Sequence, residues 1–424
     1  MFRQMVSWML ATFLLVVAAS TVSAQATSAY KQTNLISDVP GTAAITDSHV
    51  VNPWGIAASS TSPFWISDNG SGVSTLYNGT GQPFPVGSPL VVTIPPPKGS
   101  PAGTTAAPTG VVFNSTSDFS VSQGSASGPA QFLFSTEDGT ISGWNANVNR
   151  TAAILAVDNS AGSGTVYKGL TLGGNASGNF IFAANFRAGT VDVFDHTFKA
   201  ANLAGHFSDP NLPAGFAPFG IQNVNGNILV TYAKQDDKKH DDVSGSGNGF
   251  IDVFDTNGNL LRRLASGGTL NSPWRLVLAP SGFGTFSNDL LVGNFGDGRI
   301  SAFDPTTGSF LGQLSDSKGS PITIEGLWGL SFGNGSAAGS VQTLFFTAGI
   351  QHESHGLFGS LTTAPGASSA STVPSALPRT GEPVPVAPTI LLGFAVLGAG
   401  LYLRGSLLGR REDSRESGRR KSTV

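Results

Sequence analysis

The sequence predicts an all-β protein and, within that class, a six-bladed β-propeller. Phe (28 residues) far outnumbers Tyr (5), and β-branched residues are frequent, a composition that favours strands over helices. One short pattern recurs six times at nearly constant spacing, and each copy is followed by short apolar runs, several of which alternate with period two. A pair of β-sandwiches is the alternative architecture.

Each copy of the repeat opens with a triplet that ends, in five of the six copies, in Gly. The third residues of successive triplets are 55, 59, 51, 55 and 54 positions apart. Such a period, with three or four short strands per unit, is typical of a propeller, whose blades bury their faces against one another. The triplet Gly suits an innermost strand, where backbones crowd the axis. The six triplets are Pro53-Trp54-Gly55, Pro108-Thr109-Gly110, Tyr167-Lys168-Gly169, Pro218-Phe219-Gly220, Pro273-Trp274-Arg275 and Leu327-Trp328-Gly329.

The later strands of each unit follow the same order, and three of the third strands end in Phe-Asp, at Asp195, Asp255 and Asp304. The sixth unit ends soon after Leu361 and is one strand short. We expect residues 30–37 to supply that strand, because pairing the start of the chain into the last blade closes the ring and removes an open edge.

The two ends of the chain predict export. Residues 1–24 have the charged start, apolar run and small-residue cleavage site of a signal peptide. The propeller is then expected over residues 25–362, and a Ser/Thr/Ala/Pro-rich linker over 363–376. Residues 377–424 form a fourth part, in which an apolar run at 387–403 is at the short end of the length that spans a bilayer and is followed by an Arg-rich tail.

A pentapeptide precedes that apolar run: Leu377, Pro378, Arg379, Thr380 and Gly381. With the run and the basic tail, it resembles the LPxTG-type cell-wall sorting signal. The resemblance implies that a sortase-type transpeptidase cuts after Thr380 and joins the chain to the cell wall. Alternatives are the Pro-Glu-Pro signals of Gram-negative bacteria and a plain membrane anchor. All three predict display at the cell surface.

Three segments of the repeat region also resemble one family. They are Asn185 to Asp195, the opening Asn52-Pro53-Trp54-Gly55, and the ending Gly356 to Leu361. They are similar to a family of uncharacterised bacterial exported proteins, over about residues 30–362. The resemblance implies a propeller-like fold and no particular activity.

Composition excludes some functions. The first 24 residues carry a net +1 and the segment after Thr380 a net +3, so the part between carries about −7 of the total −3. An acidic domain is a poor nucleic-acid binder. The chain has no Cys, and it offers no G-x-S-x-G motif, so no catalytic residue is assigned. The partner is expected to be an unknown extracellular ligand.

Polar residues that close the second strands are candidate metal ligands. Equivalent positions in a propeller converge on one mouth of its channel, and oxygen ligands of mixed type suit Ca²⁺. This arrangement resembles six-bladed lactonases and phosphotriesterase-like hydrolases, which implies a channel calcium that polarises a substrate oxygen. The alternative is a polar turn that the repeat generates in every blade. The candidate ligands are Asp68, Glu137, Asn185 and Asn294.

An insertion in the fourth repeat, residues 234–249, is the second candidate for a functional element. It concentrates charge in a chain with only 12% charged residues, and long loops on a rigid scaffold often carry function. A solvated loop is the alternative, and Asp241 or Asp242 is best placed to reach a channel site. The sequence therefore predicts a surface-displayed binding module, with a calcium-dependent lactone or ester hydrolase as the alternative. The candidate loop residues are Asp236, Asp237, His240, Asp241 and Asp242.

Overall fold

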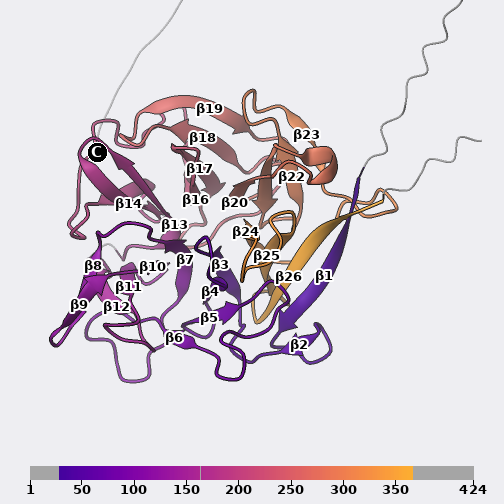
Figure 1. Ribbon diagram of the computed structural model, residues 1–424. Helices are drawn as coiled ribbons and strands as arrows, with labels where there is room; N and C mark the ends of the chain where they lie inside the picture. The colour runs from indigo at the N-terminus through magenta and orange to yellow at the C-terminus, as the bar shows by residue number, and fades with distance from the viewer. Residues whose placement is uncertain (1–27, 163, 366–424) are drawn as a thin grey trace, which may run out of the picture. The chain divides into compact units, whose positions relative to one another are not determined.

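The computed structural model describes residues 28–162 and 164–365. Within these residues six antiparallel blades surround a common axis, which confirms the predicted six-bladed β-propeller (Figure 1). The blades are numbered in chain order, and their strands are given from the axis outward. Blade 1 consists of β3 (Pro53–Ala57), β4 (Phe64–Asp68), β5 (Val73–Tyr77) and β6 (Val91–Thr93), and blade 2 of β7 (Pro108–Phe113), β10 (Phe132–Thr136), β11 (Thr140–Trp144) and β12 (Ile154–Asp158). Blade 3 consists of β13 (Tyr167–Asn175), β14 (Gly178–Asn185) and β15 (Thr190–Phe194), blade 4 of β16 (Phe216–Val224), β17 (Asn227–Lys234), β18 (Phe250–Phe254) and β19 (Leu260–Ser266), and blade 5 of β20 (Pro273–Leu278), β21 (Leu290–Asn294), β22 (Ile300–Phe303) and β23 (Phe310–Gln313).

The sixth blade joins the two ends of the described chain. Its strands are β24 (Leu327–Phe332), β25 (Leu344–Ile350), β26 (His355–Ala364) and β1 (Ala29–Ser37), with the short β2 (Ile45–Thr46) added in parallel. Strand β1 pairs antiparallel with β26, from Ala29 opposite Ala364 to Ser37 opposite Leu357, and the two lie side by side in Figure 1. The N-terminal strand therefore closes the ring as predicted.

Two small elements lie outside the blades. The hairpin β8 (Ser120–Gln123) and β9 (Ala126–Pro129) is inserted between β7 and β10, and a short 3₁₀ turn, η1 (Gly284–Phe286), precedes β21. None of the described residues forms a helix long and apolar enough to cross a membrane. The predicted signal peptide, the apolar run 387–403 and residues 377–381 lie outside the described residues, and export stays a prediction. Strand β26 continues to Ala364, so the first residues of the expected linker belong to the last blade.

Each opening triplet contains a bulge, which turns its middle residue toward the axis. In all six blades the pairing register between the innermost and second strands shifts at the triplet, and a bulge re-aims side chains in this way. The triplet Gly then lets neighbouring innermost strands approach: a Cβ on Gly220 would overlap the carbonyl oxygen of Trp274. The middle residues are all buried: Trp54, Thr109, Lys168, Phe219, Trp274 and Trp328.

Four of these middle residues are aromatic and pack together at the axis. Trp54 stacks on Trp328 at a centroid distance of 3.6 Å, and Phe295 stacks on the same Trp328 ring at 3.9 Å. Trp274 meets both Trp rings edge-on. The axis is therefore filled by apolar rings, among which Lys168 is the one charged middle residue of the six triplets.

Candidate functional site

A group of polar side chains lies over the aromatic axis, and we call it the polar mouth. Its residues come from five blades and lie in a triplet, directly before a triplet, or in loops that follow second strands. Asn52 precedes β3, and its φ of 46° is in the left-handed region that Asn tolerates. The residues of the polar mouth are Asn52, Asn69, Glu137, Lys168, His240, Asp241 and Glu353.

Hydrogen bonds link these residues into an arc around the axis. The amide of Asn52 donates to Glu353 at 3.0 Å and accepts from the indole N–H of Trp328 at 3.2 Å. The same amide donates to Asn69 at 3.4 Å, and Asn69 donates to Oε2 of Glu137 at 3.0 Å. Oε1 of Glu137 accepts from Lys168. Because such networks hold each side chain in one orientation, the arc gives the mouth a defined geometry.

Lys168 is the centre of this arc. Its side chain is 1% exposed, its ammonium lies 2.5 Å from Glu137 and 3.6 Å from Asp241, and it sits above the Trp54 ring at 4.8 Å. A buried charge is tolerated only when it is paired. Two carboxylates and an aromatic face supply that pairing, so the mouth already holds one positive charge that belongs to the protein.

The inserted loop of blade 4 reaches this centre because it folds as a hairpin. An isolated β-bridge joins Gln235 to Asp242. The Asp236 carboxylate accepts from the backbone N–H of His240 at 2.8 Å, and Lys239 adopts a φ of 54° at the turn. A side chain that caps its own turn fixes the loop locally, and here it fixes His240 and Asp241 at the tip, over the axis.

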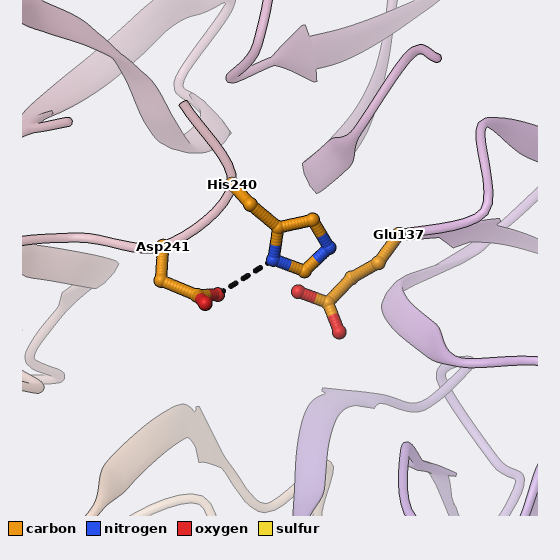
Figure 2. Close-up of side chains that lie close together, drawn as sticks. All are labelled: Glu137, His240 and Asp241. Carbon is orange, nitrogen blue, oxygen red and sulfur yellow. Dashed lines mark hydrogen bonds and ion pairs between the residues drawn. The ribbon is translucent and has the colours of Figure 1, made fainter. Parts of the chain in front are cut away.

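Figure 2 shows how Glu137, His240 and Asp241 converge. Each offers one possible ligand atom, and these atoms all lie within 4.8 Å of one another. Nδ1 of His240 donates to Asp241 at 2.8 Å. That bond raises the pKa of His240 and lowers the pKa of Asp241. One imidazole and two carboxylates form a ligand set of the kind that binds divalent transition metals.

The surroundings add further negative charge. Asp138 and Asp242 lie next to the group, and burial raises the pKa of each. Burial likewise raises the pKa of Glu353, and the nearby carboxylates of Glu137 and Asp242 act in the same direction. Carboxylates whose charge burial disfavours gain most from an additional cation, so the polar mouth is suited to a positively charged ligand.

Of the four residues of the calcium hypothesis, Glu137 belongs to the group in Figure 2, and the other three are hydrogen-bonded to other residues near them. The Asp68 carboxylate accepts from the N–H and hydroxyl of Thr75. Asn185 donates to Asp192, and Asn294 donates to the carbonyl of Thr269. Of the loop residues, Asp236 caps the turn, Asp237 is exposed, and His240 and Asp241 join Glu137.

Lys168, Asn52 and Glu353 are not among the site residues that the sequence predicts. For Lys168 a signal was present: it is the only charged residue at the middle position of a triplet, where four other copies have an aromatic residue. For Glu353 and Asn52, 301 positions apart, the contact depends on closing the ring, and no local pattern shows it.

The fold and this site define a six-bladed β-propeller with a charged site over an aromatic-filled axis. No family model matches the chain. It is 31% identical to the uncharacterised protein R648 of Acanthamoeba polyphaga mimivirus, over 80% of this chain and 81% of that one. It is also 31% identical to the uncharacterised mimivirus protein L690, over 80% of this chain and 87% of that one. The chain belongs to the same family as these proteins.

This family corrects the expected one. The predicted membership of a bacterial exported family is wrong, because the relatives found are proteins of a virus. They give no support for a sortase signal at Leu377 to Gly381, which lies outside the described residues.

The chain is also similar, at a low level, to solved structures. A streptogramin B lyase is 13% identical with a TM-score of 0.44, over 80% of this chain and 98% of that one. Virginiamycin B lyase of Staphylococcus aureus is 14% identical with a TM-score of 0.42, over 79% and 99%. Similarity at this level carries no argument about activity.

Proposed function

We propose that the protein is a ligand-binding propeller that holds a divalent transition-metal ion at the polar mouth. The observation that carries the proposal is the convergence of Glu137, His240 and Asp241 from blades 2 and 4, with possible ligand atoms within 4.8 Å of one another. A set of three protein ligands leaves coordination positions open, so a metal held there would offer them to an oxygen-bearing ligand.

The ligand types favour a transition metal over calcium. Ca²⁺ prefers six to eight oxygen ligands, whereas imidazole suits Zn²⁺, Fe²⁺ and Ni²⁺ and carboxylates suit Mn²⁺. Lys168 lowers the affinity of the site for a metal ion, because its ammonium contacts the carboxylates of both Glu137 and Asp241. An incoming ion therefore competes with Lys168 for these two groups, which would keep the affinity of the native chain moderate.

Isothermal titration of the full chain with ZnCl₂, MnCl₂ and CaCl₂ tests the proposal. We expect one ion of Zn²⁺ or Mn²⁺ per chain, weaker binding of Ca²⁺, and at least a tenfold loss of Zn²⁺ affinity in His240→Gln, since metal affinity depends on each ligand. His352→Gln, an exposed His outside the group, is the matched control. Equal affinity in the two variants, or no binding of any of the three ions, would refute the proposal.

Metal-assisted hydrolysis of a lactone or ester is a second candidate function. The observation that favours it is the same three-ligand set, because a catalytic metal needs an open position for water. The zinc-loaded full chain would then hydrolyse p-nitrophenyl acetate or a γ-lactone, and His240→Gln would lose at least tenfold of that rate. If the chain binds the metal but hydrolyses neither substrate, the hydrolase function is refuted and only the binding function is supported.

A further inference from the structure

Among the described residues, blade 3 has no outer strand, whereas every other blade has one. Its sheet ends at β15, whereas the neighbouring blade 4 continues from β18 to β19. Both blades begin the return in the same way: Phe194 forms a bridge with Ala200, as Phe254 pairs with Leu260 six residues on. In blade 3 the chain turns away after Ala201, and no strand among the described residues covers the first half of β15.

The uncovered half of β15 presents free main-chain groups. The carbonyl of Val193 accepts from the N–H of Ala201, on the side away from β14. Because main-chain groups alternate sides along an antiparallel strand, those of Val191 point to the same outer side. No hydrogen bond among the described residues engages them there. An edge of this kind is a template for pairing with another strand.

A cavity of about 430 Å³ lies where the fourth strand would run. Val191, Asp192 and Val193 line one wall, and Asn202, Leu203 and His206 line another. Its volume is within the range of about 300 to 1,000 Å³ for ligand pockets. The space is therefore bounded on its inner side by the open edge itself.

Blade 4 shows what chemistry fits opposite this edge. Asp192 in β15 corresponds to Asp252 in β18, since both are the third residue of a strand that ends in Val-Phe and is followed by Asp. In blade 4 the outer strand places Arg263 opposite Asp252, and its guanidinium pairs with Asp252 and Asp209. Asp192 has only uncharged donors: Tyr167 at 2.9 Å, Asn185 at 3.0 Å and Thr190 at 3.0 Å. No cation among the described residues pairs with it.

We propose that the open edge of blade 3 accepts an extended peptide segment of a partner protein as a fourth strand, antiparallel to β15. The segment carries a basic residue opposite Asp192, as Arg263 stands opposite Asp252. Backbone hydrogen bonds to Val191 supply the pairing, and the charge of Asp192 supplies the preference for a basic residue. This site lies on the outer strand of blade 3 and does not depend on a metal at the polar mouth.

The probe is a synthetic peptide with the sequence of β19, Leu-Leu-Arg-Arg-Leu-Ala-Ser, labelled for fluorescence anisotropy against the full chain. We expect saturable binding at or below millimolar concentration. A peptide with Glu in place of the second Arg is expected to bind at least tenfold more weakly. Asp192→Asn should weaken the Arg peptide at least fivefold, while Asp304→Asn, a partly exposed Asp that follows the third strand of blade 5, leaves it unchanged.

Hydrogen exchange locates the bound peptide. Saturation should slow exchange of the Val191 amide and leave the amides of β18, which β19 already covers, unchanged. Three outcomes overturn the proposal: no binding up to millimolar peptide, equal binding of the Arg and Glu peptides, or unaltered exchange at Val191. A concentration-dependent dimer by analytical ultracentrifugation that protects Val191 would also overturn it, because the occupant would then be a second copy of the chain.

Discussion

Blades 3 and 4 are adjacent copies of one repeat that differ where function is expected. Their first three strands share triplet, bulge and the ending Val-Phe-Asp. Blade 4 adds the outer strand β19 and the hairpin that carries His240 and Asp241. Blade 3 has neither within the part of the chain that the structure describes, but it has Lys168 where blade 4 has the aromatic Phe219. The inner strands thus set the fold, and the outer strand, the loops and one triplet position are free to differ.

Charge shows the same contrast. In blade 4 the cation on the outer strand, Arg263, pairs with two carboxylates of its own neighbourhood. In blade 3 the cation is at the axis and pairs across blades, with Glu137 of blade 2 and Asp241 of blade 4. Lys168 therefore connects three blades, and removing it should reduce the stability of the fold far more than removing an exposed charge.

The largest effect is expected from Lys168→Met, which breaks the axial pair in blade 3. The change leaves Glu137, whose side chain is 12% exposed, without its cation, and breaking a buried pair costs about 3–5 kcal/mol. Urea denaturation of the full chain measures the loss. Lys168→Met with Glu137→Gln removes both charges and should recover most of it. A double variant as unstable as the single one would show that Lys168 acts through packing and not through its charge.

A smaller effect is expected from Ala at the triplet Gly of the two blades. In Gly220→Ala the new Cβ meets the carbonyl oxygen of Trp274, a backbone atom that cannot rotate away. In Gly169→Ala the nearest atom is the backbone nitrogen of Ile221, at 2.7 Å. Overpacking costs about 1–3 kcal/mol, and the change in blade 4 should lie at the upper end. Thermal unfolding compares the two variants, and an equal loss in both would contradict the geometry.

The smallest effect concerns pH and Asp252 of blade 4. Burial raises the pKa of Asp252 to about 6, and the charge of Asp209 adds to this, against the opposing contacts of Arg263. The pKa of an unfolded Asp is about 3.9. Between these values the folded chain holds a proton that the unfolded chain has lost, so stability falls as pH rises through this window. Asp252→Asn should lack that decrease in urea denaturation at pH 4.5 and 7. Parallel pH profiles for the two proteins would contradict it.

The fold could be predicted because its information is local. A triplet, two apolar strands and a turn repeat along the chain. Because the sixth unit is one strand short, residues 30–37 are predicted to supply its last strand. The open edge of blade 3 could not be predicted in this way. Residues 200–203 begin like an outer strand. The pairing then stops because the chain leads to Phe207, which packs against Phe182 and Phe254.

The sequence predicts the site only in part. Glu137 stood among the calcium ligands and His240 and Asp241 in the charged loop, because each has a distinctive local context. Their convergence over Lys168 depends on how the ring places blades 2 and 4 on either side of blade 3, and on the hairpin that Asp236 caps. Contacts of this kind form only when the propeller ring closes, so the spacing of residues along the sequence does not show them.

X-ray absorption at the zinc edge of the zinc-loaded full chain tests most directly whether the polar mouth is a metal site. We expect one zinc per chain with oxygen and nitrogen neighbours at about 2.0–2.2 Å, including one imidazole. That imidazole should be lost in His240→Gln and kept in His352→Gln. A zinc environment that keeps its imidazole in His240→Gln, or that contains none in the native chain, would contradict the assignment of Glu137, His240 and Asp241.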